Sequence, residues 1–252
     1  MPLHLAPLAL VCALFPQMSH GVAPLSTGVV VAAPHEGFDD HTAPIAQAIA
    51  KELRTGWVVA EGYRAPRRQR WLDVNRPTQR VWTDGKKGPE RQTHEGRQTY
   101  AEYQGHVDAA AGRAPLELLV EIHGHDRQMA LGGKRVKIRA IELATRGFEP
   151  DELRALKARF EELVQKLPAE DRVLLAVEQL DESYEFRGQK VDFYFGASGS
   201  KRDGSLSAKS TRRALHFECP QHVRFDQERR ARYTQLFIDL LRPLVERHRS
   251  TR

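Results

Sequence analysis

Cysteine is nearly absent from this chain of 252 residues, which holds only Cys12 and Cys219. If an N-terminal leader containing Cys12 is removed, no intramolecular disulfide can form, which excludes a framework of disulfides. Cys219 lies in an apolar run typical of a strand, where a buried and unreactive thiol is more frequent than a nucleophile. We therefore expect the fold to depend on a hydrophobic core, for which the chain is long enough.

The sequence also lacks an apolar run that could cross a bilayer, which requires about 20 residues. The stretch from Leu5 to Phe15 is apolar and uncharged, and it has the length of a signal-peptide core, but no Lys or Arg precedes it. We expect residues 1–22 to be a signal peptide or an N-terminal extension, and residues 23–252 to form a single domain. A signal peptide implies a periplasmic or secreted protein; without one the protein would be cytoplasmic. No integral membrane segment is expected.

Charge of one sign is not in large excess, because 39 Lys and Arg face 33 Asp and Glu for a net charge of +6. Glycine and proline are near average, and the 40% of hydrophobic residues excludes collagen-like, low-complexity and mainly disordered classes. A basic segment with interleaved Trp71, Trp82 and Tyr100 is the one feature that favours nucleic-acid binding. Acidic residues interrupt it, so we predict no nucleic-acid partner. Phosphate-binding glycine fingerprints and a Gly-x-Ser-x-Gly elbow are missing as well.

What the sequence does contain is an alternation of strand-like and helix-like segments. Apolar runs predict strands at residues 29–33, 57–60, 116–122, 173–177 and 214–219, and helical spacing predicts helices at 43–53, 150–167 and 226–248. The polar stretch 64–100 is predicted to be irregular apart from an island at 71–77. Strands that alternate with helices indicate a mostly parallel α/β sheet in one domain.

Histidines and acidic residues, which can bind metals or transfer protons, gather where three of these strands end. They occupy residues 34–41 (PHEGFDDH), 123–126 (HGHD) and 216–218 (HFE). In open α/β sheets the ligand crevice lies beyond the carboxyl ends of the strands. Two imidazoles and a carboxylate from separate loops are the ligands of a catalytic zinc ion that keeps one position for water. These residues therefore favour a metal site, while a surface role remains the simpler interpretation of each histidine alone.

Four short motifs resemble those of N-formylglutamate amidohydrolase-like proteins and occur in the same order. They are VVAAPHEG at residues 30–37, DVNRP at 73–77, EIHG at 121–124 and ALHFE at 214–218. The resemblance covers residues 28–245. It implies a three-layer α/β/α, phosphorylase/hydrolase-like fold with a mostly parallel mixed sheet, similar to that of the zinc carboxypeptidases.

The resemblance also implies roles for individual residues. His35, Asp39 and His123 would bind one Zn²⁺ per chain, and Glu218 would act as the general base. Asn75 and Arg76 match the Asn-Arg pair that holds the substrate carboxylate, a task that suits a guanidinium fork. Arg76 would thereby orient the substrate for catalysis.

The residues leave alternatives open at several positions. His125 can replace or assist His123, and Glu36 or Asp40 can take the place of Asp39. Lys201, in the glycine-rich stretch 196–204, and Arg70, in a basic cluster, are candidates for further binding of an acidic group. An exposed loop is the better explanation of the first segment, and a solvated basic surface explains the second at least as well.

The function predicted from these features is a zinc-dependent amidohydrolase. It would cleave an amide bond of a small carboxylate-bearing N-acyl amino acid or peptide, and a signal peptide would favour a cell-wall or γ-glutamyl peptide. The alternative is a non-catalytic binding protein of the same fold that holds an acidic ligand. The oligomeric state does not follow from the sequence.

Overall fold

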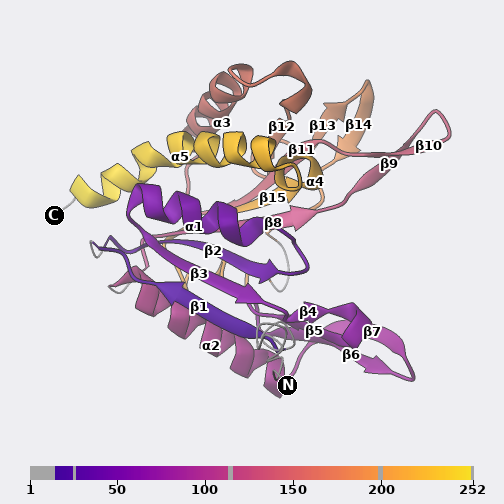
Figure 1. Cartoon of the computed structure of the whole chain (residues 1–252), viewed down its shortest axis with the longest axis vertical. Coiled ribbons are helices and arrows are strands. Elements are labelled where there is room, and N and C mark those ends of the chain that lie inside the picture. The colour runs from indigo at the N-terminus through magenta and orange to yellow at the C-terminus, as the bar shows by residue number, and fades with distance from the viewer. Residues whose placement is uncertain (1–14, 25–26, 113–115, 198–200, 251–252) are drawn as a thin grey trace, which may run out of the picture.

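A mixed seven-stranded sheet forms the middle of the protein (Figure 1). The computed structural model describes residues 15–24, 27–112, 116–197 and 201–250. From edge to edge, the strands are β1 (Gln17–Gly21), β3 (Gly56–Glu61), β2 (Val29–Glu36), β8 (Leu118–His125), β15 (Arg213–Pro220), β11 (Ala140–Arg146) and β12 (Leu174–Val177).

Most neighbouring strands of this sheet are parallel. Only the β1–β3 and β11–β15 pairs are antiparallel, whereas β2 pairs in parallel with β3 on one side and with β8 on the other. The chain leaves β2 toward β3 and later returns to β8, so the order of strands reverses between β2 and β8. In open sheets such a reversal opens a crevice at the carboxyl ends of the two strands, which is where ligands bind.

Helices cover both faces and create three layers, as predicted. α1 (Thr42–Leu53), α3 (Pro150–Gln165) and α5 (Gln227–Ser250) pack on one face, together with the short α4 (Gln221–Arg224). α2 (His94–Ala111) packs on the other face and buries Tyr103 and Val107. The predicted α/β/α class with a mostly parallel mixed sheet is confirmed.

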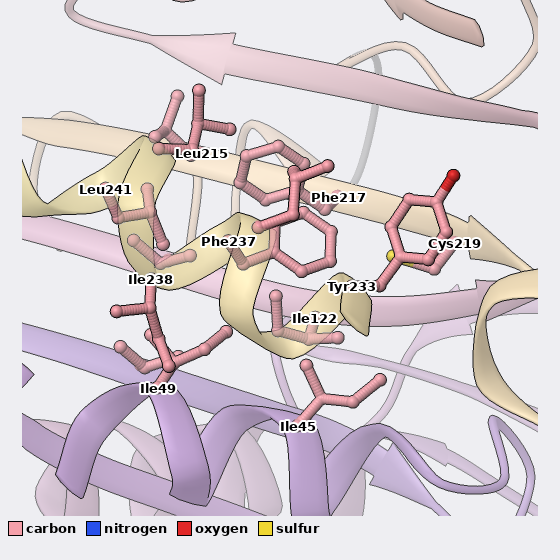
Figure 2. Close-up of a cluster of buried hydrophobic side chains, with 14 of the residues drawn as sticks. Ile45, Ile49, Ile122, Leu215, Phe217, Cys219, Tyr233, Phe237, Ile238 and Leu241 are labelled. Carbon is pink, nitrogen blue, oxygen red and sulfur yellow. The ribbon is translucent and has the colours of Figure 1, made fainter. Parts of the chain in front are cut away.

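The hydrophobic core between the sheet and helices α1 and α5 determines which side chains of β8 and β15 face the other side of the sheet. Ile122, Leu215, Phe217 and Cys219 point from β8 and β15 toward α5, where they meet side chains such as Phe237 (Figure 2). Burying each large side chain of this kind contributes about 1.5–3 kcal/mol. Because side chains alternate along a strand, the residues between these apolar ones must face the opposite side of the sheet.

Smaller sheets extend from the carboxyl ends of the central strands. An antiparallel sheet contains β4 (Arg64–Ala65), β5 (Arg70–Asp73), β6 (Thr78–Thr83) and β7 (Lys86–Gln92). Two hairpins are formed by β9 (Gln128–Leu131) with β10 (Lys134–Lys137) and by β13 (Ser183–Phe186) with β14 (Gln189–Asp192). Short 3-10 helices span Pro66–Arg68 and Ala169–Asp171.

Several elements differ from the sequence prediction. The stretch 64–100 is ordered into β4–β7 and the start of α2, because polar strands paired at the surface lack the apolar alternation that marks a half-buried strand. α2 was missed because Gly96 and Gly105 interrupt a helix that has few apolar residues. β11 was missed although its residues are almost all buried.

The N-terminal boundary also shifts. Residues 17–21, inside the expected N-terminal segment, form β1 and pair along β3 from Trp57 to Glu61. The central sheet therefore includes residues that precede residue 23. The apolar part of the expected signal peptide falls mainly on residues 1–14, outside the described residues. Among the helices described, none is long and apolar enough to cross a membrane.

Candidate active site

The loop after β2 supplies two of the candidate metal ligands. A register shift between Ala33 and Glu36 ends the regular pairing of β2 with β3 and places His35 at the crevice. The loop then turns back, and the backbone N–H of Asp39 donates to the carbonyl of His35 at 2.9 Å. Gly37 permits this turn because its φ is +82°.

The neighbouring acids have other positions. The Glu36 carboxylate accepts hydrogen bonds from the backbone N–H groups of His41 at 3.0 Å and Ala43 at 2.6 Å, and thereby stabilises the start of α1. Asp40 is exposed, and its carbonyl accepts from the buried guanidinium of Arg224. Of the three candidate acids, only Asp39 lies beside an imidazole that belongs to the predicted ligand set.

The three predicted metal ligands converge. His35 Nδ1 lies 3.0 Å from His123 Nδ1, and Asp39 Oδ2 lies 3.5 Å from the former and 3.4 Å from the latter. Tetrahedral ligands at zinc distances of about 2.0–2.2 Å are separated by about 3.3–3.6 Å. The two distances to Asp39 fall in this range, and the imidazole nitrogens are slightly closer together, so one zinc ion would be held after a small separation of the two rings. All three side chains are buried. The donor set and its spacing therefore fit the metal that the sequence predicted.

Buried carboxylates lie behind both histidines. Asp73 Oδ1 is 3.7 Å from His35 Nε2, and Glu121 Oε2 is 3.4 Å from His123 Nε2. Each ring thus turns Nδ1 toward the shared centre and Nε2 toward an acid. Carboxylates in this position orient metal-binding imidazoles and increase their basicity.

Electrostatics keep His35 and Asp39 in forms that bind cations. Burial, with a contribution from the Arg64 guanidinium, lowers the pKa of His35 to about 3, so its imidazole is neutral. Burial alone would raise the pKa of Asp39, but hydrogen bonds with His123 and His35 outweigh it and hold that pKa well below its usual range. A neutral imidazole and an ionised carboxylate are the states that a metal requires. Burial would lower the pKa of His123, but hydrogen bonds with Asp39 and Glu121 outweigh it and raise that pKa.

The predicted general base occupies the next strand. Glu218 lies opposite His123 in the parallel pairing of β15 with β8. Burial would raise the pKa of Glu218, but the hydrogen bond with His216 and the charge of Lys201 outweigh it and lower that pKa. Glu218 is therefore a carboxylate at neutral pH, as proton acceptance demands.

One cleft of about 730 Å³ is lined by the three candidate metal ligands and by Glu218. Arg76, Asn75 and Lys201 line it as well, whereas Arg70 does not. Trp71 faces the cleft, and adjacent residues of a strand point to opposite sides, which explains why Arg70 is not among the lining residues.

Two further predictions are refined by hydrogen bonds. The Asn75 amide donates from Nδ2 to Glu121 Oε2 at 3.2 Å, so the amide group is engaged with the protein. His125 has contacts at both ring nitrogens, since Nε2 lies 2.9 Å from the Ala140 carbonyl and Nδ1 accepts from the Arg127 backbone at 3.2 Å. The structure therefore places His123, and not His125, beside the other candidate ligands.

The walls of the cleft are aromatic and cationic. Phe38 packs edge-to-face on Trp71, with ring centroids 4.8 Å apart, and the Arg64 guanidinium lies 5.3 Å from the Trp71 ring centroid. Arg80 and Arg127 also line the cleft. No site role was predicted from the sequence for Phe38, Asp73, Glu121 or Arg127. Glu121 and His123 alternate with apolar residues along their strand, and this pattern could have identified Glu121 as a residue of the site.

Fold and site together define an α/β/α protein with a candidate metal centre at the switch point of its sheet. The structure is similar to that of an N-formylglutamate amidohydrolase from Ralstonia eutropha JMP134, with a TM-score of 0.55 and 13% identity over 93% of this chain and 99% of that chain. At this identity the similarity shows a shared fold.

Further solved structures match this chain with lower TM-scores. They include a gene product from Agrobacterium tumefaciens (TM-score 0.49, 10% identity, 93% of this chain and 95% of that chain) and a bacteriophage poly-gamma-glutamate hydrolase (TM-score 0.44, 9% identity, 94% and 91%). No family model and no curated protein sequence matches this chain.

Proposed function

We propose that this protein is a zinc-dependent amidohydrolase for small N-acyl amino acids or peptides that carry a carboxylate. The observation that carries the proposal is the convergence of His35, Asp39 and His123 in a cleft that also contains Glu218. When bound by these three side chains, zinc would polarise the scissile carbonyl and lower the pKa of water.

The chain's own residues supply the remaining chemistry. The Glu218 carboxylate accepts a proton from the attacking water and returns it to the departing nitrogen, which would otherwise leave as an unstable anion. His123 and Glu218 are adjacent across β8 and β15, so the residues for metal binding and for proton transfer lie on rigid neighbouring strands.

Arg76 is the residue best placed to bind the substrate carboxylate. Its guanidinium lines the cleft and is oriented by ion pairs with Asp73 Oδ2 and Glu90 Oε1, both at 3.3 Å. A fixed guanidinium can bind a carboxylate through two parallel hydrogen bonds. The cleft volume of about 730 Å³ is within the range of sites for small molecules and short peptides.

The test combines metal analysis with hydrolysis. We expect about one zinc per chain in the purified protein, and cleavage of at least one member of a panel of N-formyl-glutamate, N-acetyl-glutamate and γ-glutamyl dipeptides. His123→Ala should lose zinc, and Glu218→Gln should keep zinc while kcat falls by at least about 100-fold. His106→Ala on α2, outside the cleft, is the matched control. Full activity without metal, or in Glu218→Gln, would refute the proposal.

One observation favours a second function. Arg64, Arg76, Arg80 and Arg127 line the cleft, and they can hold an anion without any metal. A protein that binds small dicarboxylates in calorimetry, but cleaves no compound of the panel with zinc supplied, would be the non-catalytic binding protein of the same fold.

A further inference from the structure

His216 has no part in the chemistry described above, yet it is one of the most completely bonded side chains of the cleft. Its Nε2 lies 3.0 Å from Glu218 Oε1, and its Nδ1 lies 3.0 Å from Glu121 Oε2. The ring also stacks on His123, with centroids 3.9 Å apart and an interplanar angle of 23°. His216 thus connects the candidate base to a buried acid behind the metal centre.

Glu121 is a fixed anchor for this connection. Besides His216, it accepts hydrogen bonds from Tyr103 Oη at 3.1 Å, Ser205 Oγ at 2.9 Å and Asn75 Nδ2 at 3.2 Å. Its side chain is fully buried and lies on a central strand. A carboxylate held by so many donors cannot turn, so the imidazole that binds it is fixed as well.

The contact with Glu218 has a definite geometry. Oε1 is held by His216 and lies 3.6 Å from Lys201 Nζ, while no described residue donates to Oε2. Lys201 Nζ also lies 3.2 Å from His216 Nε2, so its ammonium lies against both partners of this contact. One oxygen of Glu218 is therefore tied to the protein, and the other is left for a reactant.

We propose that His216 is the positioning residue of Glu218, which it holds in the orientation for proton transfer by anchoring Oε1 to Glu121. This inference rests on the proposed hydrolase function. It predicts that loss of the Nε2 contact reduces turnover with little change in substrate or metal binding, because both ring nitrogens of His216 face carboxylates and not the centre formed by His35, Asp39 and His123. A displacement of about 1 Å at a reacting group costs about 100-fold in rate.

Two substitutions separate the contacts of the ring. His216→Asn places an amide near the position of Nδ1 and can keep the bond to Glu121, but it does not reach Glu218. His216→Gln is longer and can restore the bond to Glu218. Zinc content, thermal unfolding, kcat and KM are to be measured for both, beside His106→Asn as a histidine-to-asparagine control outside the cleft.

We expect His216→Asn to bind one zinc and to unfold at a temperature near that of the wild type, with kcat reduced by about 10- to 100-fold and KM changed by less than about threefold. His216→Gln should recover most of the lost kcat. An unchanged kcat in His216→Asn overturns the positioning role, and so does a loss of zinc or of cooperative unfolding, which assigns His216 to the scaffold of the metal centre. A wild-type protein with no activity on the panel refutes the hydrolase function itself.

Discussion

At the scale of single residues, the candidate centre depends on the way each imidazole is turned. His35 and His123 both present Nδ1 to the shared centre, which leaves Nε2 to be oriented by Asp73 and Glu121. The charge of Asp73 is balanced by two arginines. Burial would raise the pKa of Asp73, but Arg64 and Arg76 lower it to about 2. A buried carboxylate held in this way remains ionised, so it can orient a histidine at any physiological pH.

The consequence can be measured with Asp73→Asn. The amide keeps the shape but loses the charge behind His35, so we expect zinc affinity to fall by about 10- to 100-fold. Competition with a chromogenic chelator measures this affinity. Asp84→Asn, at the turn between β6 and β7 of the same small sheet, is the matched control and should leave the affinity unchanged. Equal affinities in Asp73→Asn and the wild type would show that Asp73 does not support the metal centre.

At the scale of elements, α5 is tied to the turn that precedes β12. Asp171 accepts hydrogen bonds from Arg229 Nε at 2.6 Å and Arg232 Nε at 2.8 Å. Tyr233 Oη donates to the Asp171 carbonyl at 2.8 Å. Because α5 covers β15, this junction fixes the helix on the far side of the strand that carries Glu218.

This junction predicts a dependence of stability on pH. Burial would raise the pKa of Asp171, but the hydrogen bonds with Arg229 and Arg232 outweigh it and lower that pKa below its ordinary value of 3.8. A lowered folded-state pKa contributes stability above the ordinary value, and this contribution is lost as the pH falls through that value and then through the folded one. The window is therefore at and below about pH 4.

We expect Asp171→Asn to lower the free energy of unfolding at pH 7 by about 1–3 kcal/mol, because two charge-assisted hydrogen bonds weaken. The difference from the wild type should shrink as the pH falls below about 4. Urea unfolding at a series of pH values measures both effects, with the exposed Asp192→Asn as control. A difference that stays constant with pH would exclude ionised Asp171 as its source.

At the scale of the whole molecule, the sheet is completed by residues from the N-terminal segment. β1 pairs with β3 over five residues, from Gln17 opposite Glu61 to Gly21 opposite Trp57. β1 also contacts α2, and its Met18 packs against the hydrophobic core between the sheet and α2. Without β1, the backbone of β3 would be an open sheet edge.

A comparison of two shortened chains tests this contribution. A chain that begins at residue 23 should melt about 5–10 °C lower than one that begins at residue 15, since a loss of about 2–3 kcal/mol lowers the melting temperature of a domain of this size by that amount. Thermal unfolding followed by circular dichroism measures the difference. Equal melting temperatures would mean that β1 adds no stability and that the domain begins after it.

The sequence predicted most of the central sheet and the helices on one of its faces. β2, β3, β8, β12 and β15 were recognised because they are short apolar runs, and α1, α3 and α5 because their apolar residues recur at helical spacing. The polar elements β4–β7 and α2 were missed because their pairing and packing partners, rather than their own composition, make them regular.

Local pattern alone predicted the α/β class and the polar runs at strand ends that contain His35, His123 and Glu218, and the family resemblance singled out these three residues. Only the tertiary structure selected Asp39 over Glu36 and Asp40, removed Arg70 from the cleft and brought in Asp73 and Glu121. The reason is physical: His35 and His123 are 88 residues apart in the chain, and their contact depends on strand order and register. A strand's own residues determine which of its faces is buried, but they do not determine which other strand lies beside it.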